Sequence, residues 1–363
     1  MIHDFSPFIF KLTDTFGPRW YGFSYMLGFV CAYFLIMWLV ERQQAGLNRE
    51  QVSDFITYAA FGTMIGGRLG YCVFYDPELL WSISWNLPFW KVLAVNEGGM
   101  ASHGGIIGIV FACWLYGRKY RINWIYLLDL ASIVGPIGVL FGRIANFING
   151  ELVGRIAPAD FKYGVRFPTD ILNWPSYEFD RLGTLGSVVE KINIINPVTE
   201  KITSSKWLEL VGSFRSNQES RDQVYNALSN IVNSVQNGNV EIKLALGPLL
   251  DYRYPSQLFA AATEGIFTFC ILFFLARKSR TPGFIAGAFV ICYAVVRILN
   301  ESFRMPDLQI GFQMLGLTRG QWLSVGMLAV GLVMIFYWSR TQSQIIHGWL
   351  RGENVRLGTR KLR

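Results

Sequence analysis

Polar side chains that can bind an anion or move a proton interrupt the long apolar stretches of this sequence. Guanidinium groups keep their charge at neutral pH and present a planar fork to phosphate oxygens, whereas an imidazole can accept a proton there. Arginines dominate the set, which is Arg68, His103, Arg143, Asn146, Asn149, Glu151, Arg253, Arg297, Glu301 and Arg304. These residue types predict a site that binds an anionic group and contains one general base.

Two short segments concentrate this chemistry. Residues 98–105 read Gly-Gly-Met-Ala-Ser-His-Gly-Gly, so His103 lies between two pairs of glycines, which allow a backbone or a lipid to approach closely. Residues 142–155 read Gly-Arg-Ile-Ala-Asn-Phe-Ile-Asn-Gly-Glu-Leu-Val-Gly-Arg, with donors and acceptors at the end of an apolar stretch. Simpler interpretations stay open, namely a hydrogen-bonded packing histidine and a polar helix terminus.

The composition excludes an ordinary soluble protein. Of the 363 residues, 52% are hydrophobic and 16% are charged, whereas soluble domains carry about 25% charged residues. The class that remains is an all-α integral membrane protein with several spans. The net charge of +8 is attributed to basic residues that orient the spans, so a nucleic acid is not expected as a partner. The cysteines lie in apolar segments without a Cys-X-X-Cys pair, which favours core packing over disulfides or a zinc site.

Seven segments are apolar enough over about 20 residues to cross a bilayer. They run Gly22–Val40, Asp54–Tyr75, Gly99–Gly117, Trp124–Asn149, Gln257–Ala276, Gly283–Asn300 and Gln321–Ser339. The residues between the fourth and fifth segments are too many for a plain loop. We expect them to form a small extramembrane α+β head, with strands at Val165–Phe167 and Ile192–Ile195.

Basic residues set the expected orientation. Clusters of Lys and Arg follow the first, third, fifth and seventh segments, and the positive-inside rule makes that side cytoplasmic. The N-terminus is then periplasmic and the C-terminus cytoplasmic. The expected organisation is an interfacial N-terminal segment (1–21), transmembrane helices 1–4 (22–149), a periplasmic head (150–256), transmembrane helices 5–7 (257–339) and a basic cytoplasmic tail (340–363).

The polar residues gather towards the outer membrane face. Arg68 and His103 lie in the outer parts of their segments, and only Asp129 lies near the inner face. Ionisable residues inside a bilayer are costly and are therefore candidates for function. We interpret the cluster as a site for the phosphate of an outer-leaflet lipid. Snorkelling arginines and structural ion pairs, such as Arg297 with Glu301, are the alternative.

The motifs, in their order along the chain, resemble those of the prolipoprotein diacylglyceryl transferase family. They are Arg-Trp-Tyr-Gly at 19–22 with Tyr25, Gly-Gly-Arg-Leu-Gly-Tyr at 66–71, the segments 98–105 and 142–154, Arg-Tyr-Pro-Ser-Gln-Leu at 253–258 and Arg-Ile-Leu-Asn-Glu-Ser-Phe-Arg-Met-Pro-Asp at 297–307. The 142–154 motif is highly specific. The sequence departs from the family pattern at Tyr254, Phe259 and Ala260, where a histidine, a tyrosine and a glutamate are usual.

The resemblance implies an enzyme of the bacterial cytoplasmic (inner) membrane with seven spans and a site open to the outer leaflet. It implies transfer of the diacylglyceryl group of phosphatidylglycerol to the thiol of the lipobox cysteine of preprolipoproteins, with release of glycerol phosphate. The implied partners are phosphatidylglycerol, preprolipoprotein signal peptides and the lipid bilayer, and no metal or nucleotide cofactor is implied.

The resemblance also assigns roles to residues. The catalytic residues are His103, Arg143 and Arg253, and further functional positions are Tyr25, Asn146, Glu151 and Gly154. Charge and depth add Arg68, Asn149, Glu301 and Arg304 to the substrate-binding set. His103 is expected to accept the proton of the thiol, while the two catalytic arginines bind the head group and stabilise the leaving phosphate.

Other classes of protein are weaker alternatives. A different phospholipid head-group-modifying enzyme is the nearest, although such enzymes commonly need metal-binding aspartates. An anionic-solute transporter predicts polar residues through the inner halves of the spans, which this sequence lacks. A scaffold protein would leave the arginines at head-group depth unexplained.

Overall fold

A computed structural model describes residues 1–13, 17–43, 47–85, 88–94, 98–158, 160–195, 202–305 and 316–350. The chain divides into two compact units. Unit 1 comprises Met1–Tyr25, Leu140–Thr263 and Val296–Ser324, and unit 2 comprises Met26–Val139, Glu264–Val295 and Val325–Arg363. Most of the predicted basic tail, and the last two residues of the 297–307 motif, lie outside the described residues.

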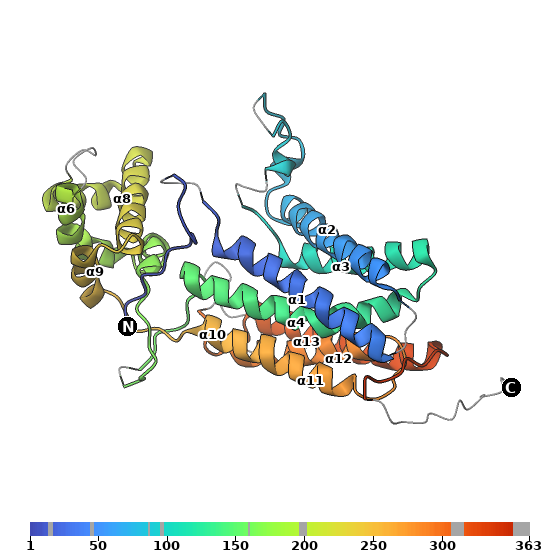
Figure 1. Cartoon of the computed structure of the whole chain (residues 1–363). Helices are drawn as coiled ribbons and strands as arrows, with labels where there is room; N and C mark the ends of the chain where they lie inside the picture. Colours follow the sequence, from blue (N-terminus) through green and yellow to red (C-terminus); the bar gives the residue numbers. More distant parts are fainter. Residues whose placement is uncertain are drawn as a thin grey trace. The chain divides into compact units, whose positions relative to one another are not determined.

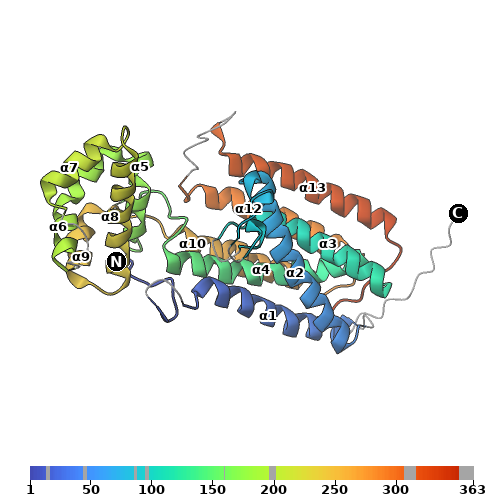
Figure 2. The ribbon, with the colours of Figure 1, turned by 90° about the horizontal axis from the view of Figure 1, so that it is seen from above.

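Five helices of the described chain are long and apolar enough to cross a membrane (Figures 1 and 2). They are α1 (Trp20–Gln43), α4 (Trp124–Asn149), the continuous helix Ser256–Leu275, α12 (Phe284–Glu301) and α13 (Arg319–Thr341). The continuous helix consists of α10 (Ser256–Ala260), the π-helical η7 (Ala261–Phe267) and α11 (Thr268–Leu275). Each overlaps a predicted segment, which confirms an integral membrane protein of the all-α class.

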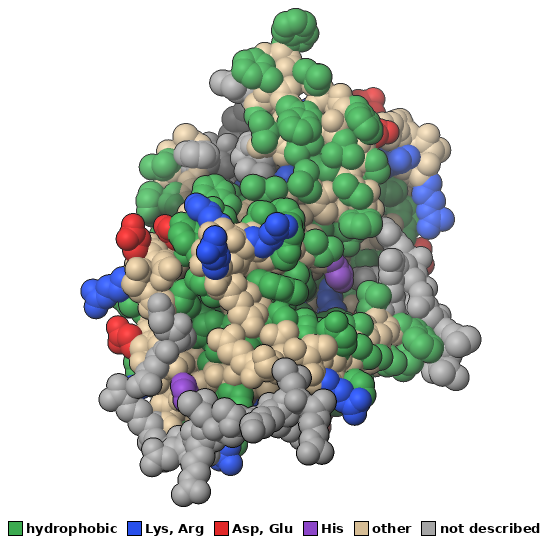
Figure 3. All heavy atoms as spheres, turned by 90° about the vertical axis from the view of Figure 1, so that its right-hand side faces the viewer, with side chains coloured by type: hydrophobic (Ala, Val, Ile, Leu, Met, Phe, Trp, Pro, Cys, Tyr) green, Lys and Arg blue, Asp and Glu red, His purple; other side chains and the backbone are tan. Residues whose placement is uncertain are grey.

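The surface of α13 shows what these helices face. Large apolar side chains are exposed along it, among them Leu332, Val333 and Phe336. Figure 3 shows hydrophobic side chains (green) over much of one face of the molecule. Lipid tails can cover such a surface, whereas water would make it unfavourable.

The two remaining predicted segments are the helices α2 (Arg49–Phe74) and α3 (Ser102–Tyr120), which lie side by side in unit 2 (Figures 1 and 2). Their contact is made through glycines. A Cβ atom added at Gly104 would clash with the carbonyl of Gly66, and one added at Gly108 would clash with that of Gly62. Close backbone packing through small residues is a common way for membrane helices to associate. Both helices are more polar than the five above, so seven crossings stay a prediction.

The described residues that follow α2, 76–85 and 88–94, carry several exposed aromatic side chains. They contain the short helices η1 (Pro77–Leu80) and η2 (Lys91–Leu93) and one β-bridge between Ile83 and Trp90. Trp81 is 80% exposed and Trp85 is 99% exposed. Aromatic side chains this open suit the interface between lipid and water.

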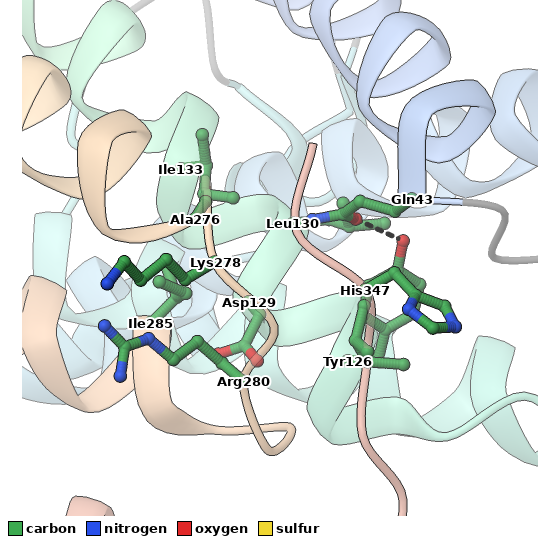
Figure 4. A pocket seen from close by; sticks show the side chains of 11 residues that line it. Gln43, Tyr126, Asp129, Leu130, Ile133, Ala276, Lys278, Arg280, Ile285 and His347 are labelled. Atoms are coloured by element: carbon green, nitrogen blue, oxygen red, sulfur yellow. Dashed lines mark hydrogen bonds between the residues drawn. The ribbon is translucent and has the colours of Figure 1, made fainter. Parts of the chain in front are cut away.

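Asp129 has a structural partner in unit 2. Its side chain in α4 is 6% exposed and accepts the backbone N–H groups of Gly283 and Ala286, both at 2.7 Å, at the start of α12. A carboxylate at a helix N-terminus satisfies donors that have no partner inside the helix. The small pocket beside Asp129, which Lys278 and Arg280 also line, contains none of the predicted site residues (Figure 4).

The insertion before α10 forms a helical cluster in unit 1 with its own hydrophobic core (Figures 1 and 2). Trp174 and Trp207 are fully buried in this core, and the indole N–H of Trp207 donates to the carbonyl of Leu182 at 2.7 Å. The helices are η4 (Pro168–Leu172), α5 (Trp174–Tyr177), η5 (Phe179–Leu185), α6 (Gly186–Ile195), α7 (Ser204–Ser213), α8 (Gln218–Gln236), α9 (Val240–Leu246) and η6 (Gly247–Leu249).

The β component predicted for this head is not confirmed. The described residues contain isolated β-bridges but no named strand. Val165 makes one bridge, to Arg253, whereas Ile192–Ile195 lies in α6, so that strand prediction is wrong. Val188 and Ile192 are four residues apart and both are buried, so the apolar run belongs to the buried face of a helix.

The N-terminus is joined to the residues that lead into this cluster. Ile2 forms a β-bridge with Arg166, and the backbone N–H of His3 donates to the carbonyl of Arg166 at 2.8 Å. The His3 ring is buried against Phe147 and Phe167 and donates from Nε2 to the carbonyl of Phe147 at 2.7 Å. Burial lowers the pKa of the His3 imidazole. The interfacial position of residues 1–21 stays a prediction.

Candidate active site

Polar side chains converge at the C-terminal end of α4. Asn146 and Asn149 are three residues apart on one face of the helix, and each donates from Nδ2 to the carboxylate of Glu151 at 3.3 Å. The phenol of Tyr21, in α1, donates to the same carboxylate at 3.2 Å and accepts a hydrogen bond from Asn146. Donors from two helices therefore orient Glu151, while its side chain stays exposed.

The turn that follows α4 is held through its carbonyl groups. The chain leaves the helix with Gly150 at φ +68° and Leu152 at φ +54°, both in the left-handed region. Side chains distant in sequence donate to three successive carbonyls: Thr169 to Gly150 at 2.6 Å, Gln257 to Glu151, and Ser256 to Leu152 at 3.0 Å. The turn is thus fixed by both the head and the start of α10.

Gly154 lies where backbone segments meet. It forms a β-bridge with Arg304, and a Cβ atom at this position would clash with the carbonyl of Tyr254 and lie 2.9 Å from that of Phe303. Both neighbours are backbone atoms, so neither can move like a flexible side chain. Only glycine fits here without displacing the turn that carries Glu151.

We expect Gly154→Ala to lower both stability and transfer activity. Overpacking of this kind costs about 1–3 kcal/mol, and the displaced turn would move Glu151. The measurement is thermal unfolding in detergent together with turnover per folded molecule. Gly212→Ala is the matched control, because a Cβ atom at Gly212 in α7 meets nothing within 4 Å. Equal behaviour of the two variants would contradict the prediction.

Arg253 is buried between the head and this turn. It lies just before α10, is 2% exposed, and makes a salt bridge to Asp170, with Nη2 to Oδ2 at 2.7 Å and Nε donating to the same oxygen at 2.8 Å. Nη2 also lies 3.7 Å from Glu178, while Nη1 donates to the carbonyl of Gly154 at 3.2 Å. Burial raises the pKa of the Asp170 carboxyl, and the Arg253 guanidinium opposes that shift. A direct contact between Arg253 and a lipid phosphate stays a prediction.

Glu301 and Arg304 support the same turn from the end of α12. Glu301 is buried and pairs with Arg297 at 3.1 Å, the ion pair that the sequence suggested, and it accepts a hydrogen bond from Thr318 at 3.0 Å. The carbonyl of Arg304 accepts a hydrogen bond from Nε of Arg155 at 2.9 Å. These residues therefore have structural partners, and their binding of substrate stays a prediction.

Arg143 and Tyr25 also belong to unit 1. Arg143 lies in α4 three residues before Asn146, so the two share a helix face, and its side chain is half-buried. The Tyr25 ring stacks on that of Tyr21 at a centroid distance of 6.3 Å and is 56% exposed. Unit 1 therefore brings together the predicted residues of α1, of α4 and its turn, and of the segments around Arg253 and Arg304.

Arg68 belongs to unit 2, where backbone carbonyls occupy its guanidinium. The side chain is 6% exposed and donates to the carbonyls of Lys91 (2.7 Å), Val92 (2.7 Å), Gly98 (2.6 Å) and Gly99 (3.1 Å). All three of its nitrogens are used. Arg68 thus joins the loop after α2 to the segment before His103, and a contact with substrate stays a prediction.

We expect Arg68→Gln to release this loop. A glutamine cannot reach carbonyls on both sides, and hydrogen bonds from a charged donor contribute about 1.5–3 kcal/mol each. Trypsin should then cleave faster after Lys91, the only Lys or Arg in residues 76–98. Arg42→Gln is the control, because Arg42 lies over the Trp38 ring in α1. Equal cleavage rates in the two variants would show that Arg68 does not hold the loop.

His103 also belongs to unit 2. It is the second residue of α3, and its side chain is exposed. Two residues earlier, Ala101 donates its backbone N–H to the carbonyl of Gly67 at 2.9 Å. The glycine contact between α2 and α3 fixes the backbone that carries it. An exposed imidazole on a fixed helix end can accept a proton from a bound thiol.

The departures from the family pattern coincide with an aromatic cluster. The ring of Tyr254 lies 6.3 Å from Phe259 and 5.4 Å from Phe303, and those two rings are 5.3 Å apart. Ala260 is buried beside them in sequence. Ring packing thus occupies positions where the family's usual residues offer polar groups.

Two residues join the site that the sequence did not single out. Tyr21 lies in the 19–22 motif, one helical turn before Tyr25, and a hydroxyl in that motif was the available signal. Asp170 gave no signal, because its partner Arg253 is 83 residues away in the chain. Tyr21 is hydrogen-bonded to Asn146 and Glu151, and the ring of Tyr25 stacks on the ring of Tyr21.

The fold and the site together define an integral membrane protein with arginine, amide and carboxylate groups at helix ends. A sequence model of the family described as prolipoprotein diacylglyceryl transferase matches residues 7–337. The chain belongs to the prolipoprotein diacylglyceryl transferase family and is therefore a transferase.

Curated relatives share this family over nearly their whole length. The chain is 56% identical over 357 residues to a phosphatidylglycerol–prolipoprotein diacylglyceryl transferase of Bdellovibrio bacteriovorus, which covers 98% of this chain and 99% of the relative. Proteins of the same name from Rickettsia akari and Neisseria meningitidis are 33% and 32% identical, over 91% and 88% of this chain and 95% and 92% of theirs.

Proposed function

We propose that this protein transfers the diacylglyceryl group of phosphatidylglycerol to the thiol of the lipobox cysteine of a preprolipoprotein, and releases glycerol phosphate. The observation that carries the proposal is the group of Tyr21, Asn146, Asn149 and Glu151 at the end of α4. Asn146, Asn149 and Glu151 lie within 142–154, the motif that is most specific for the family and that also contains Arg143, whereas Tyr21 comes from the 19–22 motif. Near full-length similarity to relatives with this name supports the same reaction.

The reaction is a substitution at carbon. The cysteine sulfur bonds to the glyceryl carbon of the lipid, the bond from that carbon to the phosphate oxygen breaks, and the oxygen leaves with its electron pair. The thiol proton must be removed, because few thiols ionise at neutral pH. His103 is the proposed base, because it is exposed at the start of α3.

The leaving phosphate gains negative charge as the bond breaks. A fixed guanidinium near that charge stabilises the transition state more than the ground state. Arg143 is the proposed direct ligand, and Asn146, Glu151 and Tyr21 orient the lipid's glycerol hydroxyls through their donor and acceptor atoms. Arg253 is the second proposed ligand of the phosphate, through Nη1, which donates to the carbonyl of Gly154 in the turn after α4. Tyr25, Arg68, Asn149, Gly154, Glu301 and Arg304 complete the proposed site as binding or positioning residues.

The proposed topology has seven spans in the bacterial cytoplasmic membrane, with α2 and α3 added to the five apolar helices. Basic residues in the last turns of α1, α3 and α13 support a cytoplasmic location for those ends: Arg42, Arg118, Lys119 and Arg340. The head and the N-terminus then lie in the periplasm, and the lipid enters the site from the bilayer.

Mass spectrometry tests the reaction directly. Purified protein is incubated with phosphatidylglycerol vesicles and a lipobox peptide, and the peptide is then weighed. We expect a gain of one diacylglyceryl group, and none in a peptide whose cysteine is replaced by serine. Transfer to the serine peptide, or no transfer to the cysteine peptide by folded protein, would reject the proposal. Phosphatidylethanolamine vesicles test the lipid head group.

A further inference from the structure

We infer that Asp170, in the head, is a positioning residue for the transfer reaction, because it holds Arg253 with its Nη1 edge towards the turn at 150–155. The inference rests on the role proposed above for Arg253. It gives the head a part in the chemistry, since Asp170 lies in η4, outside the membrane helices.

The contacts of Arg253 show which edge of its guanidinium group is occupied by carboxylates. Nε and Nη2 of Arg253 meet the same oxygen of Asp170 at 2.8 and 2.7 Å, and both side chains of the pair are 3% exposed. Glu178 adds a second carboxylate on the Nη2 side at 3.7 Å. The two carboxylates therefore restrain the guanidinium against rotation in its plane.

The other edge meets only neutral acceptors among the described residues. Nη1 donates to the carbonyl of Gly154 at 3.2 Å and lies 3.6 Å from the sulfur of Met305. Hydrogen bonds to an ionised acceptor are roughly twice as strong as those to neutral ones. An anionic oxygen that reaches this edge would thus compete well for it, whereas the Asp170 edge stays occupied.

The Nε and Nη2 edge of the Arg253 guanidinium needs a carboxylate partner for two reasons. A buried guanidinium without a partner charge is strongly unfavourable, and Arg253 is almost inaccessible to water. A rotated guanidinium would also release the carbonyl of Gly154, the residue at which the turn has no room to move. Asp170 is therefore expected to affect the rate of the chemical step through Arg253, without touching substrate.

The experiment measures steady-state kinetics of full-length enzyme with phosphatidylglycerol vesicles and a lipobox peptide, per folded molecule. We expect Asp170→Asn to reduce kcat about 10- to 100-fold, by analogy with the groups that orient metal ligands from behind, with little change in KM for the peptide. Asp170→Glu keeps the negative charge and should fold, and its kcat should lie between those of the wild type and Asp170→Asn. Glu241→Gln is the control: it removes the 3.5 Å ion pair between Lys191 and Glu241 on the surface of the same head.

A double-mutant cycle tests whether Asp170 acts through Arg253. In an Arg253→Lys enzyme, adding Asp170→Asn should change kcat less than about 2-fold, because a lysine cannot use the same bidentate geometry. Losses that multiply, or wild-type kcat in both Asp170 variants, would overturn the inference. A fall in folded yield without a fall in kcat would overturn it too.

The outcomes separate this inference from the wider proposal. If Arg253→Lys retains full kcat, both the proposed role of Arg253 and the role of Asp170 fail. If Arg253→Lys loses activity while Asp170→Asn keeps the wild-type kcat, only the role of Asp170 fails. Transfer by the wild-type enzyme tests the reaction independently of either residue.

Discussion

Arg143→Gln is expected to reduce turnover about 10²- to 10³-fold, the loss seen when one donor to a developing anion is removed. Arg143 shares a face of α4 with Asn146, which is hydrogen-bonded to Tyr21 and Glu151. A glutamine at this position keeps a donor but loses the charge that neutralises the leaving phosphate. Membrane insertion and folding should be unaffected, because α4 keeps its apolar length.

The measurement is single-turnover transfer to a lipobox peptide at saturating phosphatidylglycerol. Arg143→Lys should fall between wild type and Arg143→Gln, since it keeps the charge but not the planar fork. Arg118→Gln is the control, because Arg118 lies over the Trp114 ring in the last turn of α3. Full activity of folded Arg143→Gln would remove Arg143 from the catalytic role.

The sequence was sufficient to locate the five helices that are long and apolar enough to cross a membrane. Inside a bilayer every backbone polar group needs a partner in its own segment, so a long apolar run has one stable structure, the helix. The predicted segment Trp124–Asn149 is identical to α4, and Gly283–Asn300 differs from α12 by one residue at each end. The same reasoning found the polar end of α4, since donors there have no purpose in a plain span.

The sequence could not predict which residues, distant in the chain, pair with the buried arginines. A buried arginine predicts an acceptor but does not say whether that acceptor is a ligand, a carboxylate or a carbonyl. Arg68, in α2, donates to carbonyls of the residues that follow this helix, and Arg253 pairs with Asp170. Both pairings depend on how loops return to the helices, and residue spacing carries no information about that path.

The secondary structure of short apolar runs in the head also could not be predicted from the sequence. Ile192–Ile195 suits a strand by its residue types, but a helix of ten residues, α6, accommodates it because α7 and α8 cover the apolar face. Tertiary packing decides such cases, since the intrinsic preferences of isoleucine are weak compared with burial. The helices of the head therefore needed the three-dimensional structure, whereas the five apolar helices could be located from the sequence.

His103→Gln is expected to lower turnover at neutral pH about 10²- to 10⁴-fold, the usual contribution of a general base. His103 is exposed at a helix end that is fixed by glycine packing. A thiol of a substrate peptide can therefore approach its imidazole. Without the base, the rate should follow the fraction of thiol that ionises by itself. That fraction rises tenfold per pH unit below the thiol pKa of about 8.5.

The pH profile therefore separates a base from a packing residue. Turnover of His103→Gln should climb steadily from pH 6 to pH 8 and approach the wild-type value above it, whereas a packing defect would leave a constant fractional loss at every pH. Ser102→Ala, at the first residue of α3, is the control for damage to the helix end. If His103→Gln kept normal turnover at neutral pH, a different residue or water would have to accept the thiol proton.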